Sequence, residues 1–142
     1  MHVAQLNVAR PLEPLDSPRL AGFVGALDEV NAAADAAPGF VWRLQTDAGN
    51  ATDLRPWGDD LIVNLSVWET VEALRSYVYG PVHADVLRRR REWFSALGRP
   101  HLVLWWVAEG HRPGLEEAGE RLQRLERDGP GPEVFTLRTA PA

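Results

Sequence analysis

His83 is the side chain of this sequence best placed to do chemistry. It follows a break at Gly80-Pro81 and begins a helix that the spacing of apolar residues predicts over residues 82–97. A neutral imidazole there could act as a general base or ligate a haem iron. The structural alternative is a histidine that hydrogen-bonds locally near a helix N-terminus. Of the four consecutive arginines at 88–91, Arg90 lies nearest to the helix face that carries His83. It could meet an anionic substrate or a haem propionate, unless it belongs to a solvated exterior.

Polar side chains alternate with apolar ones along a strand expected at residues 61–68. Asn64, Ser66 and Trp68 share one face of it, and Asn7 lies on the mixed face of a strand expected at residues 3–8. These side chains could orient a planar aromatic substrate through hydrogen bonds and stacking. The alternative is a set of buried polar groups that bond to one another or to water.

Other aromatic and imidazole side chains extend the candidate set. Tyr79 flanks the helix break together with Tyr77 and could donate a proton or a hydrogen bond to a ligand, with packing at the break as the competing explanation. Trp105, in a strand expected at residues 101–107, is placed with the substrate-binding residues. The two histidines that bracket this strand, His101 and His111, have no second ligand at metal-site spacing, so we expect no protein-built metal centre.

Composition excludes several classes of function. The chain has no cysteine and no lysine, which removes thiolate metal sites, cysteine nucleophiles and Schiff-base chemistry. A net charge of −5 and a pI near 5.3 argue against a nucleic-acid partner. No apolar run approaches the roughly 20 residues of a membrane helix, and the N-terminus lacks the features of a signal peptide. We therefore expect a cytoplasmic protein with no membrane partner.

The expected order of elements is β-α-β-β-α-β, the ferredoxin-like arrangement, with an added C-terminal helix. This is an α+β fold in one domain, residues 1–142, with a core at about 2–108 and a C-terminal helix and tail at 113–142. A short segment at 134–137 could be an edge strand or an arm that adds to a partner. The strands are expected at 3–8, 40–45, 61–68 and 101–107, and the helices at 18–37, 70–79, 82–97 and 114–127. The first helix is expected to start at Ser17-Pro18, with Ser17 as N-cap and Pro18 in the first turn.

The two faces of the sheet suggest a homodimer. The uniformly apolar residues of the third strand are expected to meet the two ferredoxin helices. The opposite face carries Ile62, Trp68 and large apolar residues of the fourth strand, which is too apolar a surface to leave in water. We expect the sheet of a second subunit to stack over it, with the polar residues lining an enclosed cavity. The apolar set is Leu61, Val63, Leu65 and Val67.

Two segments, followed by His83, resemble the dimeric α+β barrel superfamily that includes antibiotic-biosynthesis monooxygenases. They are Ala37-Pro38-Gly39-Phe40 and Val67-Trp68-Glu69-Thr70-Val71-Glu72-Ala73-Leu74. Cofactor-free quinone-forming oxygenases and haem-degrading enzymes share this superfamily. His101-Leu102-Val103-Leu104-Trp105-Trp106-Val107 and Gly110-His111-Arg112-Pro113 are similar to an uncharacterised bacterial family within it, over essentially the whole chain. Resemblance to the haem degraders implies an axial-ligand position near His83, and Trp68 is the candidate for the tryptophan with which those enzymes ruffle haem.

The function expected from these residues is that of a monooxygenase-like enzyme acting on a small apolar or aromatic molecule in a cavity between sheet and helices. His83 would be base or ligand, Tyr79 a second catalytic group, and the cofactor either none or haem. The walls would be Asn7, Asn64, Ser66, Trp68, Arg90 and Trp105. The alternatives are a non-catalytic haem or small-ligand-binding protein and a structural dimer with a filled core. The sequence leaves open whether the protein is an enzyme.

Overall fold

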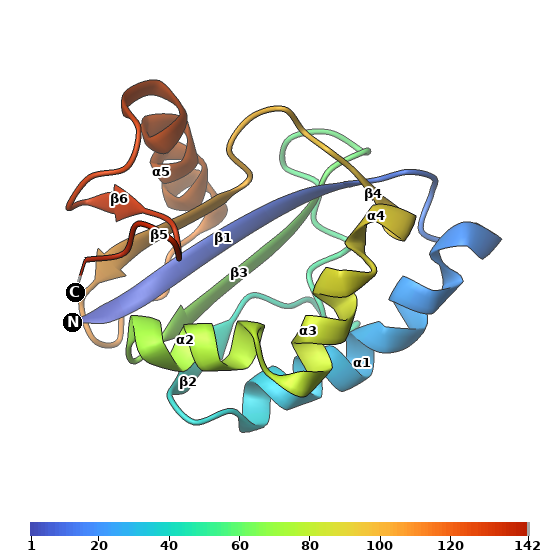
Figure 1. The fold of residues 1–142 in the computed structure, drawn as a ribbon, viewed down its shortest axis with the longest axis horizontal. Helices are drawn as coiled ribbons and strands as arrows, with labels where there is room; N and C mark the ends of the chain where they lie inside the picture. Colours follow the sequence, from blue (N-terminus) through green and yellow to red (C-terminus); the bar gives the residue numbers. More distant parts are fainter. Residues whose placement is uncertain (142) are drawn as a thin grey trace.

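The computed structural model describes residues 1–141 and shows an antiparallel sheet between two layers of helix and loop (Figure 1). Its main path runs in the order β2-β3-β1-β5-β6, and β4 adds to the far end of β1. The strands are β1 (His2–Pro11), β2 (Phe40–Arg43), β3 (Ile62–Trp68), β4 (Phe94–Ser95), β5 (Leu102–Val107) and β6 (Val134–Phe135). Central β1 pairs with β3 and β5, which confirms the predicted ferredoxin-like α+β fold.

Helices lie on both sides of this sheet. A short 3-10 turn at Pro18–Leu20 leads into α1, as the Ser17-Pro18 start predicted. The helices are α1 (Ala21–Ala36), α2 (Val71–Val78), α3 (Pro81–Arg88), α4 (Arg90–Trp93) and α5 (Leu115–Asp128). Figure 1 shows α2 and α3 on the near side of the sheet and α5 behind it. Within residues 1–141, no helix is both long and apolar enough to cross a membrane.

The helix predicted over residues 82–97 is interrupted at Arg89 and ends at Trp93, so the prediction is wrong for residues 94–97. The chain leaves α3 at Arg89, makes the single turn α4, and becomes extended at Phe94. Phe94 and Ser95 then pair with the end of β1, so β-sheet hydrogen bonds replace the helical ones at this point. The predicted edge strand near residue 134 is confirmed, because β6 pairs with β5.

The expected assignment of the two sheet faces is also wrong. The apolar face, with Leu65 and Val67 among its residues, packs against α5 and the loop between β2 and β3. The opposite face, which includes Val3, Gln5 and Trp68, lies under α1–α3 and the C-terminal tail. The physical reason is that α5 is amphipathic and buries Ala118 and Leu125 on the apolar face. One chain therefore covers both faces, and the reason given for a stacked second sheet does not hold.

Buried apolar side chains hold α5 against the sheet, and truncating one of them should lower the stability of the fold. Leu125 is 4 % exposed, so Leu125→Ala is expected to lower the free energy of unfolding by about 2–5 kcal/mol, through lost burial and the cavity left behind. Urea denaturation followed by circular dichroism measures this loss. The matched control is Leu12→Ala, at a side chain that is 37 % exposed, with an expected change of about 0.5 kcal/mol. Equal losses in the two variants would contradict the packing of α5 described above.

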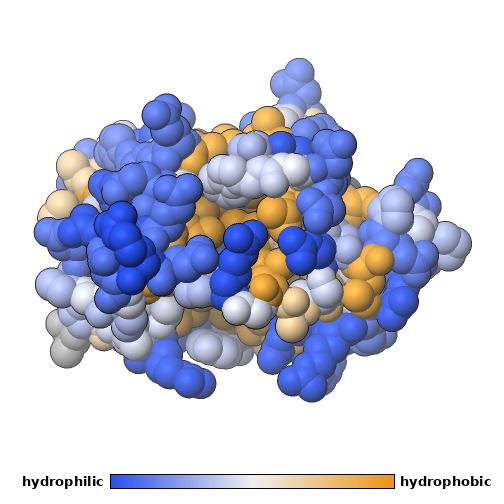
Figure 2. Space-filling view, turned by 90° about the horizontal axis from the view of Figure 1, so that it is seen from above, coloured by the Kyte–Doolittle hydropathy of each residue, from blue (hydrophilic) through white to orange (hydrophobic). Residues whose placement is uncertain are grey.

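Hydrophobic residues also remain visible on the surface. Figure 2, which views the molecule from above, shows a central band of them between hydrophilic borders. The exposed large side chains of the described residues include Leu12, Val24, Val41 and Trp57.

Candidate functional site

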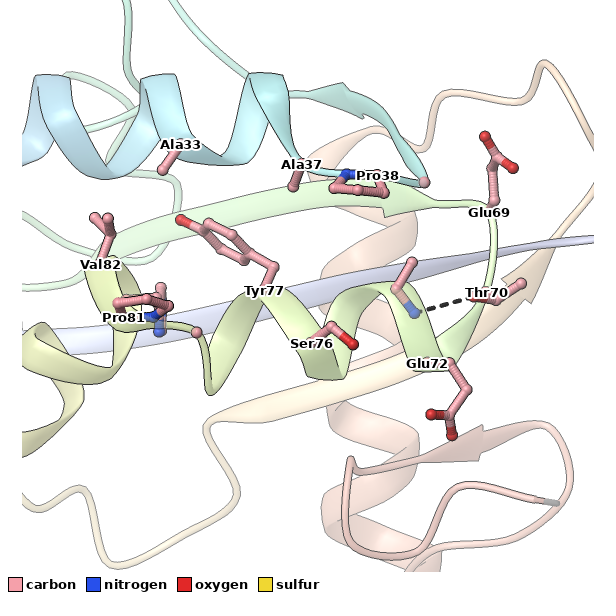
Figure 3. A pocket seen from close by; sticks show the side chains of 14 residues that line it. Ala33, Ala37, Pro38, Glu69, Thr70, Glu72, Ser76, Tyr77, Pro81 and Val82 are labelled. Atoms are coloured by element: carbon pink, nitrogen blue, oxygen red, sulfur yellow. Dashed lines mark hydrogen bonds between the residues drawn. The ribbon is translucent and has the colours of Figure 1, made fainter.

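A groove of about 510 Å³ lies between the end of α1, the β3–α2 junction and the break between α2 and α3 (Figure 3). Most of its lining is apolar or small. The lining residues are Ala33, Ala37, Pro38, Gly39, Glu69, Thr70, Glu72, Ala73, Ser76, Tyr77, Gly80, Pro81, Val82 and His83. In Figure 3, Tyr77 reaches from α2 toward α1, with Val82 at one end of the groove and Glu69 at the other.

Local backbone signals shape both ends of the groove. Gly39 has φ +83°, and a Cβ atom there would lie 2.5 Å from the Cβ atom of Ala73, so only glycine fits this turn against α2. Thr70 caps α2 by accepting a hydrogen bond from the backbone N–H of Ala73 at 3.0 Å. At the other end, Pro81 begins α3 and places His83 in its first turn.

His83 combines a fixed tautomer with a lowered basicity. Its Nδ1 atom lies 3.1 Å from the carbonyl oxygen of Val78, which can only accept, so Nδ1 carries the proton and donates it. The pKa of His83 is lowered by burial, and the bond to Val78 opposes this shift without reversing it. The imidazole is therefore neutral at pH 7, with the lone pair on Nε2.

Tyr77 is the groove residue that the sequence analysis undervalued. Its hydroxyl donates to the carbonyl oxygen of Val30 on α1 at 3.0 Å, and burial raises its pKa to about 12. Its ring stacks on Trp68 at 5.1 Å between centroids and meets the His83 ring at the same separation. The available signal was its position within the predicted helix, because only Tyr77, and not Tyr79, falls on the inward-facing stripe with Leu74 and Val78.

The polar residues of the sheet form a separate network beneath the helices. The Nε2 atom of Gln5 donates to Asn64 Oδ1 at 2.6 Å and to Ser66 Oγ at 2.8 Å, and Trp68 Nε1 donates to the same hydroxyl at 2.9 Å. Ser66 therefore accepts two bonds, which leaves its own proton to donate elsewhere. Asn64 is exposed although it lies in an inner strand, and the buried Oδ1 atom of Asn7 has no partner among the described residues.

The structure does not bring all the predicted residues together. Of the predicted residues, only His83 lines the groove. Buried Trp68 does not line it but stacks on Tyr77, which does. Tyr79 is 63 % exposed and lies outside the lining. Arg90 is exposed and donates to the backbone carbonyl oxygen of Leu87 in α3 at 2.7 Å. Trp105 faces α5 on the opposite side of the sheet, where its Nε1 atom donates to Glu117, because alternate residues of a strand face opposite ways.

Haem does not fit the lining of this groove. Its two propionates need cationic partners, whereas the charged side chains here are Glu69 and Glu72, with no arginine among the lining residues. The one imidazole present could ligate iron, but the carboxylates would repel the propionates. Among residues 1–141, no group of three or more histidine, aspartate or glutamate side chains is arranged to hold a metal ion. The lining suits an uncharged or cationic molecule with an apolar body.

Solved structures with the same fold include oxygenases. A protein from Chloroflexus aurantiacus described as an antibiotic biosynthesis monooxygenase is 18 % identical, with a TM-score of 0.54 over 80 % of this chain and 100 % of its own. SnoaB, a cofactor-independent oxygenase from Streptomyces nogalater, is 18 % identical, with a TM-score of 0.53 over 80 % of this chain and 98 % of its own. Rv0793 from Mycobacterium tuberculosis is 15 % identical, with a TM-score of 0.54 over 78 % and 100 %. At these identities the likeness shows a shared fold.

Comparisons of sequence place the chain more narrowly. No curated protein matches it. A family model described as a domain of unknown function, DUF3291, matches residues 2–142. The predicted similarity to an uncharacterised family over essentially the whole chain is therefore confirmed. This chain belongs to the DUF3291 family, with a ferredoxin-like fold of the antibiotic-biosynthesis-monooxygenase type.

Proposed function

We propose that this protein is a monooxygenase-like enzyme that needs no bound cofactor and acts on a small aromatic molecule in the groove. The observation that carries the proposal is His83, a neutral imidazole whose Nδ1 atom is held by Val78 while the ring lines an apolar groove. A base with a pKa below neutrality is ready to take a proton at pH 7. The similar fold of SnoaB, a cofactor-independent oxygenase, supports the same kind of chemistry.

The chemistry proposed for this base needs only oxygen as co-reactant. Nε2 of His83 takes a proton from an activated methylene carbon of a reduced aromatic ring system. The carbanion then supplies its electrons to O2 and forms a carbon–oxygen bond. Loss of water gives a carbonyl, so that one oxygen atom enters the product, the other leaves in water, and the substrate itself is the reductant. His83 returns the proton to that water.

The groove residues have distinct proposed roles. Tyr77 offers an aromatic wall beside His83, and its hydroxyl is occupied by Val30. Because burial raises its pKa to about 12, Tyr77 stays protonated and supplies no base. The sheet residues remain proposed substrate contacts of a second region, where exposed Asn64 and the unpartnered Asn7 oxygen would offer a donor and an acceptor.

The proposal is tested with anthrone, a reduced tricyclic aromatic whose oxidation yields anthraquinone. The expected result is consumption of one O2 per anthrone, faster than in buffer, with anthraquinone and water as products. An oxygen electrode and anthraquinone absorbance measure the two sides of this balance. His83→Gln, which keeps a side chain able to bond to Val78, is expected to reduce the rate to that of buffer.

A non-catalytic small-ligand carrier is the competing function, because the groove needs no catalysis to hold an aromatic molecule. Nuclear magnetic resonance separates the two. If anthrone shifts the backbone signals of Ala73 and Tyr77 while oxygen uptake equals that of buffer, the carrier is favoured over the enzyme.

The homodimer predicted from the sequence is kept as a proposal independent of activity. Because α5 covers the apolar sheet face within one chain, a second subunit would have to contact another surface, such as the hydrophobic band in Figure 2. Sedimentation velocity decides between one chain and two.

A further inference from the structure

The charged side chains of the groove indicate which charge its ligand should bear, in addition to an aromatic body. Its two acidic side chains, Glu69 and Glu72, come from the β3–α2 junction, and no lysine or arginine lines the groove. The imidazole of His83, at the other end, is neutral because burial lowers its pKa. A ligand lying along the groove therefore meets a negative end and an uncharged basic end.

The two carboxylates differ in how far their charge is already compensated. Glu72 lies in the first turn of α2, where the helix dipole favours it, and it pairs with Arg75 at 2.9 Å. Glu69 precedes the cap residue Thr70, which itself satisfies the N-terminus of α2. Within residues 1–141, the Glu69 carboxylate has neither an ion-pair partner nor a hydrogen bond, so its charge is free to act on a ligand.

The position of Glu69 is fixed by the backbone. Its N–H group donates to the carbonyl oxygen of Gly39 at 2.8 Å, and the left-handed turn at Gly39 packs against Ala73. The backbone of Glu69 is therefore held at one end of the groove, and its exposed side chain extends from there. The cations nearby on these elements are engaged elsewhere: Arg43 pairs with Asp35 at 2.7 Å, and Arg75 also donates to Leu137 at 2.7 Å.

We infer that the groove selects an aromatic ligand bearing a protonated amine over uncharged and anionic analogues, with Glu69 as the residue that discriminates between them. The inference rests on the proposed function for the location of the binding site, and it names the class of molecule that this site takes. An ammonium group at Glu69 gains an attraction that an alcohol lacks, and a carboxylate suffers repulsion there. The same repulsion separates haem from this groove.

The test uses three probes of similar shape: naphthylmethylamine, naphthylmethanol and naphthoate. Each is titrated into isotopically labelled protein at pH 7, and the shifts of the Ala73 and Tyr77 backbone signals give the affinity. The amine is expected to bind about two- to fivefold more tightly than the alcohol, as for an exposed ion pair, and naphthoate more weakly than either. Raising the salt concentration should reduce the preference.

Matched variants identify the residue responsible. Glu69→Gln is expected to remove the difference between amine and alcohol while retaining the binding of the alcohol. Glu116→Gln, at an exposed glutamate in the first turn of α5 on the other side of the sheet, is expected to leave the preference unchanged. Hemin, a dianionic probe, is expected not to bind through His83. Its Soret absorbance should therefore show no saturable change that is present with the wild-type protein and lost in His83→Ala.

Other outcomes would contradict the charge selection, the role of Glu69 or the binding site itself. Equal or tighter binding of naphthoate would overturn the charge selection while leaving the groove as a binding site. A preference for the amine that survives Glu69→Gln would overturn the role of Glu69. Absence of groove shifts with all three probes would overturn the inference together with the proposed site. Selective amine binding with no oxygen uptake from anthrone would instead count against the enzymatic function alone.

Discussion

Replacing His83 with alanine is expected to lower kcat/KM for the oxygenation of anthrone by about 10²–10⁴, the usual contribution of a positioned general base. The physical reason is that Nε2 is the neutral proton acceptor in the groove, held by the bond from Nδ1 to Val78. Since alanine removes the base and leaves the apolar walls, kcat should fall much more than substrate affinity does. Oxygen uptake gives kcat, and equilibrium titration gives affinity.

The pH dependence follows from the same residue. The pKa of His83 is lowered from its ordinary value of 6.5, so kcat/KM should rise with pH through a pKa below 6.5 and be level at pH 7 and above. Stability follows the same sign. The unfolded chain binds the proton more readily, so the free energy of unfolding falls as the pH drops below 6.5 toward the pKa of the folded protein. His83→Gln should remove the dependence of stability on pH in this range.

Two comparisons make the His83 result decisive. Replacement of the exposed histidine His101 by alanine is the matched control and should leave kcat/KM unchanged. A His83→Ala protein that folds normally and oxidises anthrone at the wild-type rate would show that His83 is a structural histidine. Its hydrogen bond to Val78 would then be its whole role.

Replacing Trp68 with alanine is expected to lower the free energy of unfolding by about 3–5 kcal/mol, the range for large aromatic residues in a core. Trp68 is 1 % exposed and links three parts of the molecule. Its ring stacks on Tyr77 of α2 and meets Phe40 edge-on at 5.4 Å, while Nε1 donates to Ser66. Urea denaturation measures the loss, which comes from a cavity on the sheet face under α2.

A second substitution separates packing from hydrogen bonding. Trp68→Phe keeps most of the ring contacts and loses the bond to Ser66, for which about 0.5–1.5 kcal/mol is expected. Trp57→Ala serves as the control, because Trp57 is 37 % exposed and should lose less than half as much as Trp68→Ala. Similar losses at the two tryptophans would contradict the buried packing of Trp68 against Tyr77 and Phe40.

Local patterns predicted most of the fold. Period-two alternation located β1 and β3, a continuous apolar run located β5, and the Ser17-Pro18 start located the first helical segment. These signals depend on near neighbours in the chain. The end of the helical segment at Trp93 was missed because Phe94 and Ser95 pair with β1, more than 80 residues away in sequence. No helical pattern in residues 82–97 could reveal that distant partner.

The candidate site was predicted less completely, for a related reason. The polarity of Asn64, Ser66 and Trp68 distinguished one face of β3 from the other, and on that face the structure places their hydrogen-bond network with Gln5. The layer that covers each face could not be predicted. It is decided by the packing of α5 on the apolar face, a tertiary contact that periodicity does not encode. The same limit applies to Trp105. The sequence shows which residues of β5 share its face, but not that α5 is the layer covering that face. Tyr77 is important only because α1 places Val30 within reach of its hydroxyl.

The attachment of α5 to its own sheet changes how burial of that face responds to dilution. Two subunits that cover each other separate when their concentration falls below the dissociation constant. Here the covering helix is tethered through the short connection between β5 and α5, so its effective concentration is set by that connection. The apolar face therefore stays covered in a single isolated molecule, at whatever abundance the cell maintains.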